Sequence, residues 1–188
     1  MRIISGNFKG KKILLPKDKL TRPLKDLTKE SMFNIIKHSK LLNINLENSN
    51  ILDLFSGVGS FGLECLSRGA NYVTFLESYK EVLTVLKKNI NNLKQQDYSS
   101  IIERDIFSEN TLKVLNNKFD IIFMDPPYKE KRLVSLLDVI IRLKLLKDEG
   151  VIIIHRHKKE KDIFPSNFNI IMKKNYGISN IIFGNALA

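Results

Sequence analysis

Short apolar runs alternate with amphipathic stretches over residues 46–188. Five of the apolar runs have the length and composition of buried strands, and they lie at 51–55, 72–77, 101–104, 119–124 and 151–155. The stretches between them show helical spacing of apolar residues, at 61–67, 80–93, 111–115 and 133–146. This alternation predicts an α/β fold of the Rossmann-like type, with a mostly parallel sheet covered by helices on both faces. Two further strand-like runs, joined near Tyr176 and Gly177, predict a C-terminal antiparallel hairpin.

The first 45 residues follow a different pattern. Two short apolar runs flank a glycine-containing turn, which predicts a hairpin, and a proline-bearing connector follows it. From Asp26 to Lys40 the spacing is helical, and we expect Asp26 to cap this helix. Its expected apolar stripe consists of Leu27, Met32, Phe33 and Ile36. We therefore expect a short N-terminal extension over residues 1–45 and a main domain over residues 46–188.

The positive charge of the chain is concentrated in its first quarter. The net charge is +11, and residues 1–45 hold eleven Lys/Arg against three Asp/Glu, while residues 46–188 hold twenty against seventeen. A basic extension on a nearly neutral body favours a polyanionic partner, most simply nucleic acid, and the alternative is a solvated lysine-rich surface. Cys65 is the only cysteine, which excludes an intramolecular disulfide and fits a reducing cytosol. We expect a cytoplasmic protein with no membrane segment and no secretory signal.

Residues 53–62 read DLFSGVGSFG, and this loop resembles a dinucleotide-binding fingerprint with Glu77 about twenty residues later. Acidic residues stand at or near the ends of four successive predicted strands, namely Asp53, Glu77, Asp105 and Asp125. An edge lined with carboxylates repels the pyrophosphate of NAD, but it suits S-adenosylmethionine, which carries a sulfonium and an ammonium. The simpler alternative is that these acids are turn residues and helix caps.

Residues 119–128 read FDIIFMDPPY, an apolar strand that runs into Asp125, Pro126, Pro127 and Tyr128. Two prolines make this turn stiff, and Asp125 is held extended because it precedes a proline. Asp125 and the Pro126 carbonyl can accept the two N–H groups of an exocyclic base amine, and Tyr128 can stack on a flipped-out base. We therefore assign the catalytic role to these four residues. The alternative is a proline turn that ends a strand beside a surface tyrosine.

The glycine loop, Glu77, the stretch Asp105 to Phe107 and the DPPY turn resemble the motifs of class I S-adenosylmethionine-dependent N-methyltransferases. DPPY and its Asn-first relative occur in enzymes that methylate adenine N6, cytosine N4 and guanine N2, so the turn leaves the base open. RIISGNFKGKK, TRP at residues 21–23, KESMFNII and the later KKNYGISNIIF resemble the bacterial 16S ribosomal RNA guanine-N2 methyltransferases nearly end to end.

This resemblance implies roles for named residues. Asp53 and the glycines hold the methionine part of the cofactor, Glu77 the ribose, and Asp105 the adenine amine with Ile106 against the ring. The implied cofactor-binding residues are Asp53, Phe55, Ser56, Gly57, Gly59, Glu77, Asp105, Ile106 and Arg22. The expected RNA-binding residues are Arg2, Lys9, Lys11, Lys12, Arg22, Lys129, Lys131 and Arg132, so that Arg22 is assigned to both groups. Ser56 stands where many relatives have Ala.

The resemblance thus implies methyl transfer from S-adenosylmethionine to the N2 amine of a guanine in small-subunit ribosomal RNA, as part of a ribonucleoprotein particle, by a monomer. An adenine-N6 methyltransferase acting on DNA or RNA is the close alternative. An NAD-dependent oxidoreductase and a nucleic-acid binder without catalysis are more distant ones. We expect no metal site, because His155 and His157 have no third ligand in view, and we expect Cys65 to pack in the core.

Overall fold

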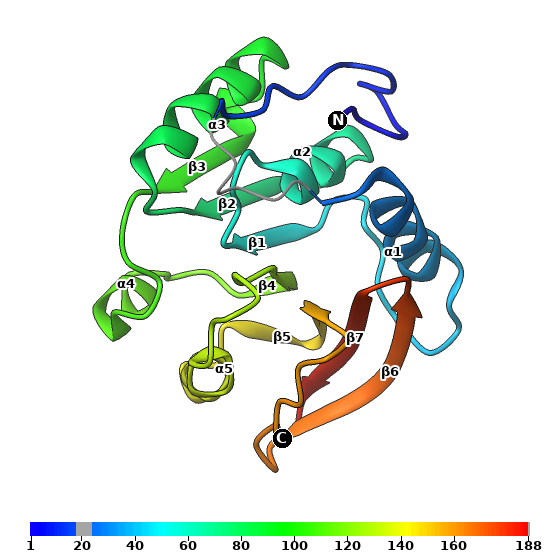
Figure 1. Ribbon diagram of the computed structural model, residues 1–188, viewed down its shortest axis with the longest axis vertical. Coiled ribbons are helices and arrows are strands. Elements are labelled where there is room, and N and C mark those ends of the chain that lie inside the picture. The colour runs from blue at the N-terminus through cyan, green and yellow to red at the C-terminus, as the bar shows by residue number, and fades with distance from the viewer. Residues whose placement is uncertain (18–23, 188) are drawn as a thin grey trace.

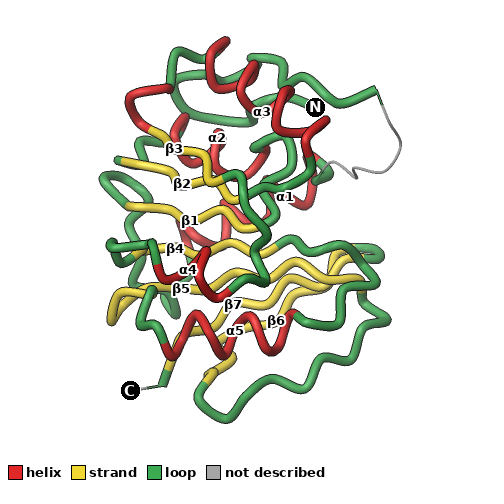
Figure 2. The backbone as a smooth tube through the Cα atoms, turned by 90° about the vertical axis from the view of Figure 1, so that its left-hand side faces the viewer, coloured by secondary structure: helices red, strands yellow, loops and turns green. Residues whose placement is uncertain are grey.

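The fold is taken from a computed structural model, which describes residues 1–17 and 24–187. Its centre is a seven-stranded sheet in the order β3-β2-β1-β4-β5-β7-β6, and Figure 2 shows these strands side by side. The strands are β1 (Asn50–Leu54), β2 (Tyr72–Leu76), β3 (Ser99–Ile102), β4 (Phe119–Met124), β5 (Leu146–His157), β6 (Phe168–Tyr176) and β7 (Ser179–Ala186). The first five pair in parallel, while β7 pairs antiparallel with both β5 and β6. The predicted mixed α/β sheet with a C-terminal hairpin is confirmed.

Helices cover both faces of the sheet (Figure 1). They are α1 (Asp26–His38), α2 (Ser60–Ser67), α3 (Lys80–Asn92), α4 (Glu109–Lys113) and α5 (Leu133–Arg142), with a short 3-10 helix at Gln96–Tyr98. Apolar residues of α1, α2 and α3 pack in one core, where Phe61 stacks between Phe33 and Phe123. Apolar residues of α4 and α5 pack in a second core on the opposite face, around Leu54 and Ile154.

Several details of the predicted elements are wrong. Asp26 is the first residue of α1 and not its cap, because Lys25 holds the N-cap position with extended backbone and no capping side chain. Leu27 is 71 % exposed and lies outside the buried stripe, which does contain Met32, Phe33 and Ile36. The last predicted helix ends at Arg142 rather than Leu146, and β5 begins at Leu146 rather than residue 151.

The N-terminal segment is joined to α2 by a buried ionic network. Glu64 is fully buried and accepts hydrogen bonds from the backbone N–H groups of Ile4 and Ser5 at 2.8 and 3.0 Å. Its carboxylate also pairs with Lys29 Nζ at 3.1 Å and with Arg68 Nε at 2.8 Å. Burial lowers the pKa of Lys29, and the adjacent Glu64 carboxylate opposes this shift. The network fixes residues 1–5 and α1 against α2.

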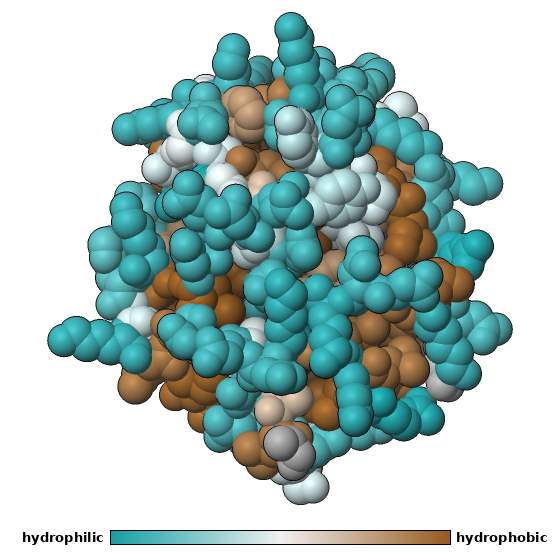
Figure 3. Space-filling model, turned by 180° about the vertical axis from the view of Figure 1, so that it is seen from behind, coloured by the Kyte–Doolittle hydropathy of each residue, from teal (hydrophilic) through white to brown (hydrophobic). Residues whose placement is uncertain are grey.

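The surface is mostly hydrophilic when the molecule is seen from behind, with apolar side chains visible between the polar ones (Figure 3). In the described part of the chain, none of the helices combines the length and apolar character needed to cross a bilayer.

Candidate active site

One edge of the sheet gathers a row of polar side chains. This carboxyl edge is formed by the C-terminal ends of the parallel strands. The row crosses β2, β1, β4, β5 and β7 in that order and consists of Glu77, Asp53, Asp125, His155 and Ser179.

Strand register places the row on a single face. Asp53 pairs with Phe75 of β2 and with Phe123 of β4, and Phe123 pairs with Ile153 of β5. Because side chains alternate along a strand, the residues two positions beyond these partners share the face of Asp53. This is the face covered by α1, α2 and α3, so the row begins where the first core ends.

The glycine loop between β1 and α2 is a tight backbone turn. Gly59 is the N-cap of α2 and has φ +84°, in the left-handed region that favours glycine. Gly62 packs against β2 so closely that an added Cβ would lie 2.4 Å from the ring of Phe75. Ser56 donates its hydroxyl proton to the carbonyl of Leu76 at 2.9 Å, so this serine ties the loop to the end of β2.

Asp53 is the most deeply buried carboxylate of the row, at 1 % exposure. Its Oδ2 accepts the backbone N–H of Gly62 at 2.9 Å, and its Oδ1 is buried with no hydrogen-bond partner among the described residues. Burial raises the pKa of Asp53 to about 8, and the negative charges of Asp125 and Glu77 act in the same direction. A buried acceptor without a donor calls for a ligand group that brings positive charge or an N–H.

Glu77 closes the other side of the loop. Its Oε2 accepts the backbone N–H of Gly57 at 2.9 Å, and its Oε1 accepts those of Ser78 and Tyr79 at 2.8 and 2.9 Å. A carboxylate offers about four acceptor positions, so Glu77 retains capacity for a hydroxyl donor.

The residues predicted to contact adenine follow β3. Asp105 is exposed, and its Oδ1 accepts the backbone N–H of Phe107 at 3.0 Å, whereas Ile106 is 7 % exposed. The ring of Phe107 contacts that of Phe55 at 5.7 Å between centroids, and the Arg132 guanidinium lies 3.6 Å over it. This contact joins the β3 loop to the segment that follows the DPPY turn.

The DPPY turn leaves the end of β4 beside the glycine loop. Pro126 is buried, Pro127 is exposed, and Asp125 and Tyr128 are half-buried. The carbonyl of Pro127 accepts the backbone N–H of Glu130 at 2.9 Å, which tightens the turn. Asp125 therefore presents its carboxylate at the same sheet edge as Asp53.

Two histidines on β5 contact this turn, and neither was expected to have a role. His155 Nδ1 lies 2.7 Å from Oδ1 of Asp125, and its Nε2 lies 2.8 Å from Oγ of Ser179. The ring of His157 meets that of Tyr128 edge-on, with centroids 5.0 Å apart. The spacing of the two histidines carried the signal, because residues two apart on a strand share a face.

The predicted RNA-binding residues fall into two groups. Lys129, Lys131 and Arg132 are exposed next to the DPPY turn, although Arg132 also forms two side-chain hydrogen bonds with Glu130. The N-terminal group comprises Arg2, Lys9, Lys11 and Lys12, all exposed. Its loop is bonded to Ser67 at the end of α2 that lies away from the glycine loop. Arg22 lies outside the described residues.

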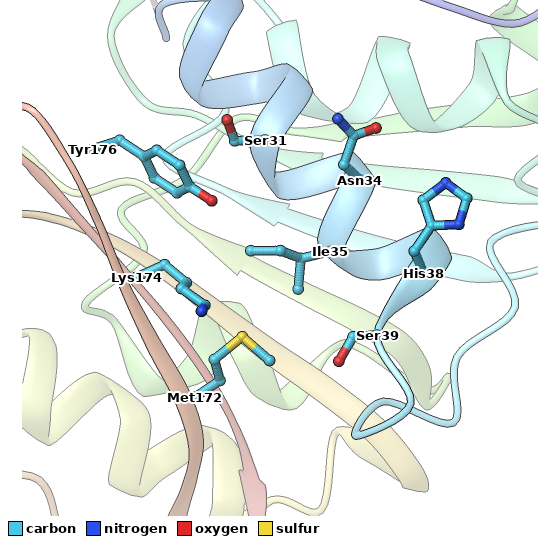
Figure 4. Close-up of a pocket in the computed structure, with 8 residues that line it drawn as sticks. All are labelled: Ser31, Asn34, Ile35, His38, Ser39, Met172, Lys174 and Tyr176. Atoms are coloured by element: carbon cyan, nitrogen blue, oxygen red, sulfur yellow. The ribbon is translucent and has the colours of Figure 1, made fainter.

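A separate cavity of about 530 Å³ lies between α1 and β6 (Figure 4). Ser31, Ile35 and His38 of α1 line one side of it, and Lys174 and Tyr176 of β6 line the other. The cavity contains none of the row's carboxylates.

The residues of the carboxyl edge fit a cofactor with positive charge. The unpartnered Oδ1 of Asp53 and the proximity of three acids disfavour a pyrophosphate and suit a sulfonium or ammonium group. The sheet order, the antiparallel β7 and the acidic edge together define the fold of class I methyltransferases.

Comparison with known proteins agrees. A solved structure described as putative methyltransferase yhhF from Escherichia coli superposes with a TM-score of 0.82 at 26 % identity, covering 100 % of this chain and 98 % of that one. A putative methylase from Haemophilus influenzae gives a TM-score of 0.77 at 31 % identity and covers 100 % and 99 %. Ribosomal RNA small subunit methyltransferase D of Buchnera aphidicola is 35 % identical over 176 residues, which are 92 % of this chain and 86 % of that protein.

The family described as conserved hypothetical protein 95 matches residues 1–185. The chain belongs to this family, a class I methyltransferase family that includes the proteins named ribosomal RNA small subunit methyltransferase D.

Proposed function

We propose that this protein transfers a methyl group from S-adenosylmethionine to the exocyclic N2 amine of one guanine in small-subunit ribosomal RNA. The observation that carries the proposal is the position of Asp125. Its carboxylate lies at the end of β4, on the same sheet face as the acid-lined glycine loop of β1 and β2. A base amine held by Asp125 would therefore lie beside the cofactor.

S-adenosylmethionine, when bound, supplies an activated methyl group on a positively charged sulfur. Asp53 would hold the positive charge of the methionine part, since its Oδ1 has no partner among the described residues. Glu77 would accept a ribose hydroxyl at its remaining acceptor position. Ile106 and Asp105 would hold the adenine, and Phe55 would pack beside them.

The DPPY turn would orient the base. The lone pair of an exocyclic amine is conjugated with the ring, so the nitrogen is a weak nucleophile until its N–H groups are held out of plane. Asp125 and the Pro126 carbonyl supply the two acceptors, and Tyr128 supplies a stacking surface. Once the nitrogen is alkylated its proton becomes acidic, and Asp125 can accept that proton.

The names of the relatives support ribosomal RNA of the small subunit as the substrate. We propose that the enzyme meets this RNA within a ribonucleoprotein particle. We assign the contacts with phosphates to the exposed basic residues of the extension over residues 1–45 and to Lys129 and Lys131. The protein would act in the cytoplasm, as a monomer.

The test is methyl transfer from labelled S-adenosylmethionine to unmodified small ribosomal subunits, with protein-free RNA and duplex DNA alongside. The products are digested to nucleosides. Label in N2-methylguanosine from the ribosomal substrate supports the proposal. Label only in adenine would replace it with the adenine-N6 alternative, and transfer to DNA in preference to RNA would overturn the ribosomal assignment.

A further inference from the structure

The pairing of β4 with β5 places a histidine behind the acid of the DPPY turn. Met124 pairs with Ile154, so Asp125 and His155 are the next residues along the two strands. The side chain of His155 is only 8 % exposed, and that of Asp125 is 23 % exposed. The contact therefore lies between the protein interior and the open edge.

Hydrogen-bond chemistry assigns the proton between them. The Asp125 carboxylate can only accept, so the 2.7 Å contact requires that Nδ1 of His155 carry a hydrogen. In neutral His155 the other nitrogen, Nε2, is then an acceptor, and the Ser179 hydroxyl 2.8 Å away can donate to it. Ser179 is 5 % exposed, so solvent competes little for this bond.

The bond commits one oxygen of Asp125. With Oδ1 held by His155, the carboxylate is fixed in rotation and Oδ2 remains for the substrate. Without His155 the carboxylate would be free to turn about its last bond, on the sheet face that it shares with Asp53. Errors of about 1 Å in the position of a reacting group can cost about 100-fold in rate.

We propose that His155 is a positioning residue for Asp125, which it holds through Nδ1 while Ser179 fixes the ring. This inference rests on the proposed function, because it needs Asp125 to bind the base amine. It adds a β5 and a β7 residue to a site that the motifs confine to β1, β2, β3 and β4.

Two substitutions separate the role of Nδ1 from that of the ring. In His155→Asn the amide nitrogen takes the place of Nδ1 and can still donate to Asp125. In His155→Gln the amide nitrogen takes the place of Nε2 and points toward Ser179 instead. We expect His155→Gln and His155→Leu to lower kcat by about 100-fold, and His155→Asn to stay within about fivefold of the wild type. The affinity for S-adenosylmethionine should be unchanged in all three.

His38→Leu is the matched control, since His38 is exposed on α1 and lies outside the row. It should leave kcat unchanged. Equal kcat in the wild type, His155→Gln and His155→Leu would overturn the inference, as would equal losses in His155→Asn and His155→Gln. If the wild type methylates adenine instead of guanine, the proposed base is wrong, and the same variants are compared on that substrate.

A second measurement needs no turnover. Nitrogen-15 NMR of the wild-type protein reports which nitrogen of each of the three histidines carries a proton, and His38→Leu helps to assign the signals. The inference is supported if Nδ1 of His155 carries a proton in the wild type and donates it in a hydrogen bond to a carboxylate. In Asp125→Ala the signature of that hydrogen bond should be absent. An Nδ1 without a proton would overturn it, whatever the substrate proves to be.

Discussion

Asp53 and Gly62 are joined by a 2.9 Å hydrogen bond that uses one carboxylate oxygen and leaves the other buried without a partner in the described chain. This relationship links the glycine loop to the chemistry of the site. The same carboxylate that shapes the start of α2 holds an unused acceptor at the carboxyl edge. Such a group is costly to the folded protein until a ligand satisfies it.

We expect Asp53→Asn to make the stability of the protein less sensitive to a rise in pH from 4 to 8. The folded pKa of Asp53 is raised from 3.8 to about 8, so between these values the folded state keeps a proton that the unfolded state has released. Stability contributed by this group therefore falls as pH rises from 4 to 8, by at most about 1.4 kcal/mol per pH unit. In urea unfolding at pH 5, 6.5 and 8, the free energy of unfolding of Asp53→Asn should increase relative to that of the wild type as pH rises. The variant should also bind the cofactor more weakly. A constant difference across these pH values would contradict the assignment.

Asp125→Ala should abolish methyl transfer, a loss of at least about 100-fold, because the amine loses its principal acceptor. Cofactor binding should persist, since the contacts of Asp53 and Glu77 lie on β1 and β2. Single-turnover transfer and calorimetric binding of S-adenosylhomocysteine measure the two effects separately. Asp138→Ala on the exposed side of α5 is the control, and near-normal turnover of Asp125→Ala would defeat the proposed role.

Tyr128 should act through its ring. Stacking of a base on an aromatic side chain is worth about 1–3 kcal/mol, so Tyr128→Ala should lower kcat/KM for ribosomal subunits by about 10- to 100-fold. Tyr128→Phe keeps the ring and should retain most of the activity. Steady-state kinetics with varied subunit concentration distinguishes the two variants, and equal losses in both would point to the hydroxyl instead of the ring.

Replacing Lys129 and Lys131 together by Gln should weaken subunit binding and make it less dependent on salt. Each lost phosphate contact reduces the slope of log affinity against log salt by roughly 0.7–1. Filter binding at several salt concentrations measures this slope. The control is Lys118→Gln, which lies just before β4 on the opposite edge of the sheet and should leave the slope unchanged. An unchanged slope in the double variant would show that Lys129 and Lys131 do not contact the RNA.

Glu64→Gln should destabilise the fold by about 3–5 kcal/mol, because Lys29 and Arg68 would lose their buried counter-charge. Glu103→Gln removes a half-exposed partner of Lys87 and should cost less than about 1 kcal/mol. Urea denaturation followed by circular dichroism compares the two variants. Similar midpoints for both would show that the buried network contributes little.

The elements that could be predicted are those whose local pattern of apolar and polar residues indicates a strand or a helix. Alternating apolar runs and amphipathic stretches located the strands, and the acids of the row stand at their C-terminal ends. The boundary between α5 and β5 lacked such a signal. After α5 ends at Arg142, Lys144 has φ +53°, a left-handed conformation in which glycine is usual. The apolar residues Leu143, Leu145 and Leu146 continue the helical spacing beyond the end of α5.

The spacing of His155 and His157 indicates a shared strand face, but the contact of His155 with Asp125 could not be found from the sequence around it. Its role depends on which residue of β4 lies beside it, and this is set by the pairing of Met124 with Ile154. The Glu64 network was hidden for a related reason. Charged residues in helices usually face solvent, and only the packing of residues 1–5 on α2 shows that Glu64 does not.

The alternation of side chains along β4 has a consequence for how this protein can change. A slip of β4 by one position against β1 would bring Met124 into the row and turn Asp125 toward α5, with every apolar contact of the strand exchanged. Insertions and deletions in the connections at the opposite edge of the sheet would thus leave the site in place, whereas a single added residue inside the strand would remove it. The hydrogen bonds between β1 and β4 fix the register of the two strands, and this register sets the position of Asp125 relative to Asp53.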